Sequence, residues 1–201
     1  MVEINLNLKD CYRSCSVTRW QIVKTVKNQS LAEHSYQVAL ITKRLCQLYC
    51  ESEEFTNQAV WYALTHDMAE VLTGDLASPL KKLLGPMALK NLSELEGSIK
   101  VLGNSPLPGT SRDSEIRKVV KIADIIEAIA FLTQEASTNH GWSVMSHLQE
   151  RLDNLNDPVV NRVVAEVLLH DETILDDIVS CFDFDSPDPI LAADVSCAQQ
   201  L

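Results

Sequence analysis

Glycine, basic side chains and long apolar runs are all scarce in this sequence of 201 residues. It has only 6 Gly and no alternating stretch bounded by hairpin turns, which argues against a β-rich fold. Its 17 Lys and Arg face 28 Asp and Glu, and the formal net charge of -11 argues against a surface for duplex nucleic acid. No run approaches the roughly 18 apolar residues of a membrane span, and the first residues lack the layout of a signal peptide. We therefore expect a cytoplasmic protein that binds neither nucleic acid nor membranes.

The cysteines lack the spacing of a zinc ribbon. Two pairs have members four residues apart, which puts both on one face of a helix, and two further cysteines stand alone. Without a secretory signal, we expect reduced thiols that pack as small apolar groups. The cysteines are Cys11, Cys15, Cys46, Cys50, Cys181 and Cys197.

Helical periodicity dominates the chain, in which 46% of the residues are hydrophobic and 22% are charged. Ser30 and Glu33 have the spacing of a capping box. Thr56 and Ser78 are predicted to cap two further helices, and Asp157 precedes the last one. These patterns predict a single all-α domain. The predicted helices cover residues 31–50, 56–72, 78–84, 86–102, 115–136 and 158–181, with a loop rich in Gly, Pro and Ser over 103–111.

Three places in the predicted helices carry side chains that can bind a metal ion. His34 stands near the start of the first long helix, and His66-Asp67 stand late in the next. Asp124 lies inside the apolar segment Val-Val-Lys-Ile-Ala-Asp-Ile-Ile, where a buried carboxylate needs a cation or a metal as its partner. Two imidazoles and two carboxylates suit a borderline divalent ion such as Zn, Mn, Co or Ni. Such a set leaves positions open for water and substrate.

Each of these side chains also has an ordinary structural interpretation. A lone histidine is more often a satisfied core or surface residue, and Asp124 alone is compatible with a narrow polar stripe that faces solvent. A second adjacent pair, His170-Asp171, is followed only by acidic residues of the tail, with no distant helix to complete a ligand set. We interpret that second pair as structural or solvent-facing.

Longer motifs surround the candidate ligands and resemble those of a known family. The order His…His-Asp…Asp is that of the HD-domain metal-dependent phosphohydrolases. The motifs are Arg19-Trp20, Ala32-Glu33-His34-Ser35 with Gln37-Val38-Ala39, and His66-Asp67-Met68-Ala69-Glu70-Val71-Leu72-Thr73-Gly74-Asp75-Leu76. With them the chain resembles the bacterial 5'-deoxynucleotidases and their phage relatives, including dATP triphosphohydrolases of phages that replace adenine in their DNA. The resemblance runs from about Arg19 to the helix of Asp124, and more loosely to the last helix.

The resemblance implies an HD-domain helical bundle over residues 1–182 with a divalent metal ion at its centre, followed by a loose tail over 183–201. It implies one transition metal ion (Zn, Co, Mn or Ni), leaves open a second divalent ion with a triphosphate substrate, and suggests a homo-oligomer. Glu70 would act with Asp67 in catalysis, moving the proton of the attacking water or of the leaving oxygen. Without the resemblance, Glu70 would read as an exposed helix carboxylate. The implied metal ligands are His34, His66, Asp67 and Asp124.

The resemblance also implies a set of substrate contacts, each with an ordinary alternative. Arg19 would clamp phosphate, and Trp20 would lie against the sugar, although a core or anchoring tryptophan is the alternative. Asp75 would hold the 3'-hydroxyl of the deoxyribose, or else simply form a turn. Ile22 would face the base, or else belong to the core. Lys81 or Lys82 would add a point charge, or else lie in solvent.

These roles imply a metal-dependent phosphohydrolase of 2'-deoxynucleotides, most simply a 5'-deoxynucleotidase that releases phosphate from a deoxynucleoside monophosphate. The alternative within the class is a triphosphohydrolase that converts dATP to deoxyadenosine and triphosphate. An alternative from another class is a helical module that binds a nucleotide without turnover. That module would be favoured by the loss of a ligand or of Glu70, and all of them are present.

Overall fold

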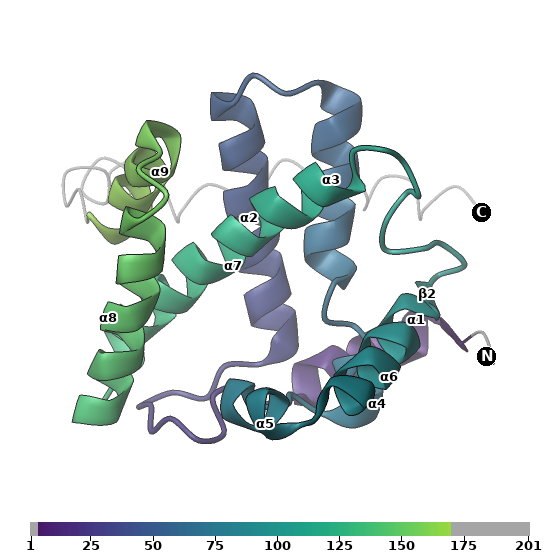
Figure 1. Ribbon diagram of the computed structural model, residues 1–201, viewed down its shortest axis with the longest axis horizontal. Coiled ribbons are helices and arrows are strands. Elements are labelled where there is room, and N and C mark those ends of the chain that lie inside the picture. The colour runs from purple at the N-terminus through teal and green to yellow at the C-terminus, as the bar shows by residue number, and fades with distance from the viewer. Residues whose placement is uncertain (1–3, 170–201) are drawn as a thin grey trace, which may run out of the picture. The chain divides into compact units, whose positions relative to one another are not determined.

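Helices make up most of the computed structural model, which describes residues 4–169. In chain order its elements are β1 (Ile4–Leu6), α1 (Leu8–Tyr12), the 3-10 helix η1 (Arg13–Ser16), α2 (Leu31–Leu48), α3 (Glu53–Thr65), α4 (Glu70–Thr73), α5 (Ser78–Leu83), α6 (Pro86–Gly97), β2 (Ile99–Val101), α7 (Asp113–Glu135), α8 (Asn139–Asp153) and α9 (Pro158–Leu168). Figure 1 shows α7 crossing α2 and α3, which also contact each other. The predicted all-α class is confirmed.

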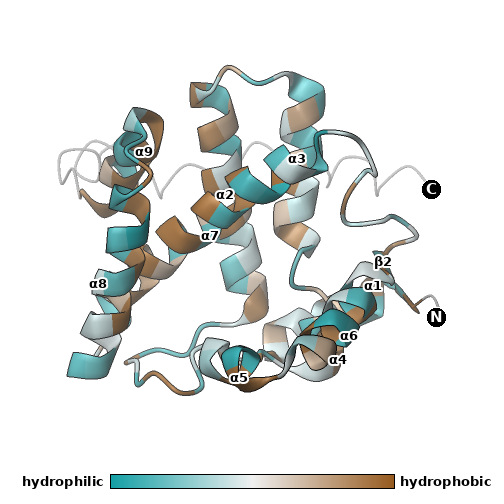
Figure 2. Ribbon diagram, viewed as in Figure 1, coloured by the Kyte–Doolittle hydropathy of each residue, from teal (hydrophilic) through white to brown (hydrophobic). Residues whose placement is uncertain are grey.

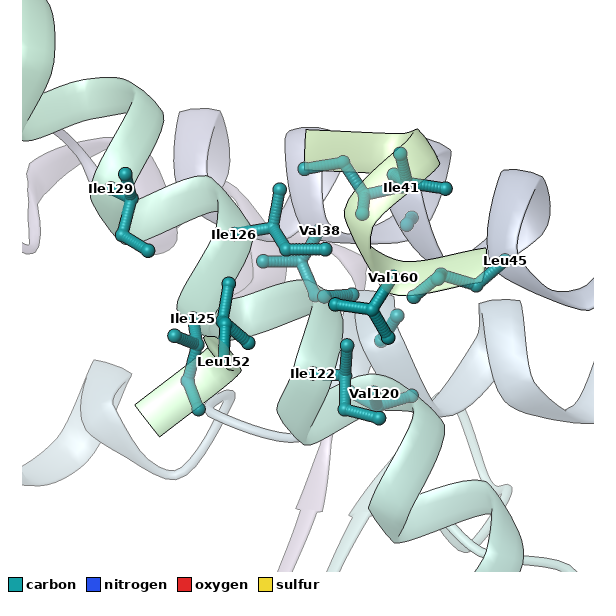
Figure 3. Packing of buried hydrophobic residues seen from close by; sticks show 14 residues of the cluster. Val38, Ile41, Leu45, Val120, Ile122, Ile125, Ile126, Ile129, Leu152 and Val160 are labelled. Carbon is teal, nitrogen blue, oxygen red and sulfur yellow. The ribbon is translucent and has the colours of Figure 1, made fainter. Parts of the chain in front are cut away.

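The main core lies between α2, α3 and α7, with α8 and α9 packed against them. Its fully buried side chains include Leu45 of α2, Ile126 of α7 and Val160 of α9. Figure 3 shows these side chains gathered between the helices, and Figure 2 shows apolar segments of α7 where it crosses α2. Burial of apolar surface holds such helices together. This core therefore fixes the two helices that carry His34 and Asp124.

A small parallel sheet joins the beginning of the described chain to its middle. Ile4 pairs with Ile99 and Leu6 with Val101, and these strands pack in a second core together with Met68, which follows the His-Asp pair. The sequence analysis did not identify these two strands, because strands of three residues are too short to show an alternating pattern. The sheet and the second core support the segment that carries the candidate ligands.

Two of the predicted helix caps are wrong. Ser52, not Thr56, caps α3, because the Ser52 hydroxyl accepts the Phe55 N–H at 3.2 Å. Ser78 is the first residue of α5 rather than its cap, and Ala77 before it makes no side-chain capping bond. Both errors shift a helix boundary without changing the helix itself.

The other two predicted caps are confirmed. Ser30 Oγ accepts the Glu33 N–H at 3.2 Å, and the Glu33 carboxylate accepts the Ser30 N–H at 2.8 Å, which completes the capping box of α2. Asp157 Oδ1 accepts the Val159 N–H at 2.8 Å at the start of α9. The capping box fixes where α2 begins, and with it the position of His34 in the first turns.

Helix α8 was not predicted, and α6 is shorter than predicted. Thr138 caps α8 by accepting the Gly141 N–H at 3.4 Å. Met145, Leu148 and Leu152 follow one another at helical spacing and pack in or against the main core, so the sequence carries a helical signal here that the prediction missed. The predicted helix over 86–102 ends at Gly97, because the chain turns into β2.

None of the helices within residues 4–169 has the length and apolar character needed to cross a membrane. Four cysteines in this part of the chain are free thiols, as predicted. They are Cys11, Cys15, Cys46 and Cys50. Cys181, Cys197, the pair His170-Asp171, the predicted end of the last helix near residue 181 and the predicted boundary at residues 182–183 lie outside the described residues.

Candidate metal centre and active site

The segment after α3 carries His66, Asp67 and Glu70 on tight turns instead of continuous helix. The helix predicted to reach residue 72 ends at Thr65, and the His66 N–H makes the last helical bond, to the Tyr62 carbonyl at 2.8 Å. Glu70 N–H then donates to the Asp67 carbonyl at 2.9 Å, and α4 begins. This tighter spacing keeps Glu70 beside the His-Asp pair.

The four predicted metal ligands come together from α2, the α3–α4 turn and α7. His34 Nε2 lies 3.5 Å from Asp124 Oδ1 and 3.8 Å from Asp67 Oδ2. His66 Nε2 lies 3.3 Å from the same Asp67 oxygen. The ligand atoms of His34, His66 and Asp67 all lie within 4.8 Å of one another. Segments up to 90 residues apart (from His34 to Asp124) therefore present nitrogen and oxygen donors to one small volume.

The two imidazoles have the orphaned atoms that a metal ion would bind. His34 Nε2 and His66 Nε2 are buried and have no hydrogen-bond partner among the described residues. The Nδ1 atom of His66 meets the Ala63 carbonyl at 2.9 Å, so Nδ1 carries the proton and Nε2 has a free lone pair in the neutral ring. Leaving such atoms unpaired is costly, and a borderline divalent ion accepts nitrogen lone pairs together with carboxylate oxygens. The residues present fit such an ion.

The ionisable side chains of the cluster shift one another's pKa values. Burial alone would lower the pKa of His66, but the carboxylates of Asp67 and Asp124 outweigh it and raise the pKa to about 9. Burial would raise the pKa of Asp67, but the neighbouring His66 and Arg19 charges lower it. Burial likewise opposes the ionisation of Asp124, whose pKa is nevertheless lowered, chiefly by Lys121. The cluster therefore favours ionised carboxylates and attracts a cation, which is a proton on His66 when no metal is bound.

Arg19 and Lys121 are the cations that contact the carboxylates of the cluster. Arg19 donates to Asp67 Oδ2 at 3.2 Å, and its second terminal nitrogen lies 4.0 Å from Asp124. Lys121 donates to Asp124 Oδ2 at 2.5 Å. The Arg19 side chain is only 13% exposed and its Nε has no hydrogen-bond partner among the described residues, so it retains a donor for an anion.

Glu70 is buried beside the cluster. It is 7% exposed, and its Oε2 atom has no hydrogen-bond partner within residues 4–169. Desolvation, together with the negative charges of Asp67 and Asp75, raises the pKa of Glu70 to about 8. An acid with a pKa near neutrality is suited to proton transfer. Burial thus excludes the alternative interpretation of Glu70 as an exposed helix carboxylate.

One cavity of about 820 Å³ opens beside the cluster and is lined by all the predicted substrate contacts. Ile22 is 55% exposed, so it is not a core residue. Trp20 has a φ of 62°, which is unusual for a bulky side chain, and its ring stacks on Phe131 with centroids 5.9 Å apart. The predicted contacts on the lining are Arg19, Trp20, Ile22, Asp75, Lys81 and Lys82.

The same cavity is lined by further basic residues that the sequence analysis missed. Lys121 lies one turn before Asp124 on α7 and Arg117 lies two turns before it, and this spacing is visible in the sequence. His140, His147 and Arg151 come from α8, which was not predicted. The lining of the cavity is therefore more basic than the predicted Arg19 and Lys81 imply.

Gln29 and Glu127 are two buried polar residues that were also missed. Glu127 Oε2 lies 2.6 Å from His34 Nδ1, and Glu127 Oε1 accepts from Gln29 Nε2 at 2.5 Å. Glu127 follows Asp124 by three residues in an apolar helix, so it faces the same side. An acidic residue three positions after Asp124 was the signal in the sequence that could have identified Glu127. The sequence contains no comparable signal for Gln29.

Comparisons with known proteins find similar hydrolases of nucleotides. A family model described as "5'-deoxynucleotidase YfbR-like" matches residues 11–170. A dATP triphosphohydrolase of Acinetobacter phage SH-Ab 15497 is 30% identical, over 87% of this chain and 98% of the relative. A 5'-deoxynucleotidase of Vibrio atlanticus is 26% identical, over 81% and 92%. The solved structure of a Cyanophage S-2L HD phosphohydrolase, bound to dA and one catalytic Zn²⁺ ion, is 28% identical with a TM-score of 0.63, over 83% of this chain and 94% of that one.

Proposed function

The chain belongs to the YfbR-like 5'-deoxynucleotidase family and is an HD-domain phosphohydrolase of deoxynucleotides; on that premise we propose that its substrate is a 2'-deoxynucleoside triphosphate, dATP foremost. Water would add to the α-phosphorus while the bond from that phosphorus to O5' breaks. The products would be the deoxynucleoside and tripolyphosphate. The phage relatives named dATP triphosphohydrolase support this choice of substrate.

The observation that carries the proposal is the concentration of cations around the cavity. Six of the 17 Lys and Arg of an acidic chain line it. They are Arg19, Lys81, Lys82, Arg117, Lys121 and Arg151. A triphosphate has more oxygens and more negative charge than a monophosphate, and each phosphate group benefits from its own charged donors. A lining of this kind exceeds what a single phosphate requires.

We propose that His34, His66, Asp67 and Asp124 hold one divalent transition metal ion. When bound, such an ion polarises a phosphoryl oxygen and lowers the pKa of a water molecule toward neutrality. Zn is the ion with direct support from the solved relative. The two Nε2 atoms, once His66 has lost its extra proton to the incoming ion, and the carboxylate oxygens are the donor set that this ion prefers.

The protein residues then divide the reaction among them. Arg19 binds the reacting phosphoryl group and stabilises its growing negative charge. Glu70 accepts the proton of the attacking water and returns a proton to O5' as the bond to phosphorus breaks. Its pKa of about 8 falls when a cation binds nearby, which makes the ionised base available at neutral pH. Asp67 orients the site through its contacts to His66 and Arg19.

Other residues of the cavity lining would select the sugar and the base. Asp75, which lines the cavity, would accept a hydrogen bond from the 3'-hydroxyl of the deoxyribose. Trp20 would exclude the larger ribose, since an absent hydroxyl is recognised only by rejecting its presence. Ile22, exposed on the lining, would contact the base.

A 5'-deoxynucleotidase acting on monophosphates is the second candidate. It is favoured by the description of the family model and by the Vibrio relatives of that name. Arg19, directly beside Asp67, is sufficient to bind one phosphate.

The products of dATP and dAMP distinguish the two candidates. We expect the metal-loaded protein to release tripolyphosphate from dATP, and to act on dAMP more slowly. Arg151→Gln removes a cavity cation and is expected to raise KM for dATP more than for dAMP. Lys43→Gln, which removes an exposed charge of α2 outside the cavity, is the matched control. Orthophosphate from dAMP, with dATP unreacted, would establish the second candidate instead.

A further inference from the structure

A line of hydrogen-bonded polar side chains runs from the lining of the cavity to the cluster of candidate metal ligands. Trp20 Nε1 donates to Gln29 Oε1 at 2.9 Å, and Gln29 Nε2 donates to Glu127 Oε1 at 2.5 Å. The other Glu127 oxygen lies 2.6 Å from His34 Nδ1. Gln29, Glu127 and His34 are only 2%, 1% and 0% exposed. A buried network of this kind stabilises one arrangement only when every donor meets an acceptor.

The donors and acceptors along this line are ordered in one direction. An indole N–H can only donate, so Gln29 must turn its oxygen toward Trp20 and its nitrogen toward Glu127. The two carboxylate oxygens of Glu127 serve as acceptors on either side, Oε1 for the Gln29 amide and Oε2 for the Nδ1–H of His34. The remaining ring nitrogen, Nε2, is then left with a lone pair. That atom is the one that faces Asp67 and Asp124.

We propose that Gln29 and Glu127 are positioning residues that hold His34 in the tautomer and orientation that bind the metal, with the Trp20 indole setting the direction of the hydrogen bonds. Neither residue lines the cavity. This inference rests on the proposed metal site and names what supports it. Carboxylate partners of metal-binding histidines fix the ring in this way.

The backbone around the line is arranged to keep it in place. The Arg19 N–H donates to the Gln29 carbonyl at 2.9 Å, which ties the two ends of the loop before α2. Trp20 adopts its positive φ there, and its ring stacks on Phe131. Phe131 follows Glu127 by four residues, so one face of α7 supports both the indole and the carboxylate.

Exchanging the two side chains tests the direction of the hydrogen bonds. In Glu127→Gln the new amide nitrogen faces the Gln29 nitrogen, and two donors meet. In Gln29→Glu two carboxylates meet. The double variant Gln29→Glu/Glu127→Gln restores the order, because Glu accepts from Trp20 and from the new Gln, whose oxygen accepts from His34. If Gln29 and Glu127 only filled space, the two single substitutions would not be expected to compensate each other in the double variant.

The readout is the Zn²⁺ or Co²⁺ dissociation constant of the EDTA-stripped protein, measured by competition with a chromophoric chelator. Each single variant is expected to bind about 10- to 100-fold more weakly. The double variant is expected to bind at least about tenfold more tightly than either single variant. Gln29→Met, which removes the amide without adding a charge, provides the same comparison should paired carboxylates prevent folding, and we expect it also to bind the metal more weakly.

Thr42→Val is the matched control. Thr42 is a fully buried polar residue of α2, eight residues beyond His34, and its hydroxyl has no hydrogen-bond partner among the described residues. It is expected to leave the metal dissociation constant unchanged, with thermal unfolding confirming that each variant folds. Single variants that bind like the unaltered protein, or a double variant no better than the singles, would overturn the inference. An unaltered protein that binds no metal would instead refute the proposed function, and the inference with it.

Discussion

Replacing Glu70 by glutamine is expected to stabilise the metal-free protein while it removes activity. Glutamine has nearly the shape of a protonated glutamate and cannot accept a proton. Glu70 is buried among Asp67 and Asp75, and its desolvation raises its pKa from 4.5 to about 8. A neutral side chain at this position therefore relieves the cost of placing a third negative charge beside the other two.

The sign and size of the effect follow from proton binding. A carboxyl whose pKa is raised on folding binds its proton more tightly in the native state, so its contribution to stability is present below pH 4.5 and is lost as the pH rises through about 8. The slope in that window is at most about 1.4 kcal/mol per pH unit. Between pH 5 and pH 7.5, Glu70 alone is therefore expected to lower the free energy of unfolding by on the order of 3 kcal/mol. His66, with a pKa raised from 6.5 to about 9, adds a loss of the same sign between those values in both proteins.

The assay is urea unfolding in EDTA at a series of pH values from 5 to 9. The free energy of unfolding of the unaltered protein is expected to fall as the pH rises from 5. That of Glu70→Gln is expected to stay constant until His66 begins to titrate. Glu53→Gln, at an exposed position in the first turn of α3, is the control and is expected to follow the unaltered protein. If the free energy of unfolding of Glu70→Gln and of the unaltered protein changed with pH in parallel, the reasoning would be refuted. With metal bound, Glu70→Gln is expected to keep the ion and lose a factor of about 100 to 10,000 in kcat.

Two further substitutions test the ligand and sugar assignments. Asp124→Ala is expected to remove metal and activity together, whereas Asp171→Ala changes neither; metal analysis of the purified variants decides, and full metal content in Asp124→Ala would disprove the four-ligand set. Trp20→Ala, assayed at a metal concentration that saturates the site, is expected to raise the turnover of ATP relative to dATP. An unchanged ratio in that folded variant would leave the choice of deoxyribose to other residues.

The sequence predicts most of the helices because their apolar faces repeat with helical period. α2 and α7 lie close to their predicted ranges, since the capping box and the apolar run around Asp124 are local signals. The prediction missed α8 although Met145, Leu148 and Leu152 repeat at helical spacing, and it missed β1 and β2 because their pairing joins residues far apart. Tertiary contacts, not local pattern, create the two strands.

In the candidate site, too, some residues could be predicted from the sequence and others could not. His34, His66-Asp67 and Asp124 were found through the motif order, and the structure brings them together. Gln29 was not found, because its role depends on an amide oxygen and nitrogen that meet Trp20 and Glu127 only in the folded chain. Hydrogen bonds between distant residues have no period in the sequence, so the supports of a site are harder to predict than its ligands.

The most direct test of the proposed reaction is the hydrolysis of dATP by the metal-loaded protein in water enriched in ¹⁸O, with mass spectrometry of the products. Attack at the α-phosphorus predicts tripolyphosphate that carries one ¹⁸O atom and deoxyadenosine without the label. Orthophosphate together with dADP, or the label in deoxyadenosine, would contradict the account.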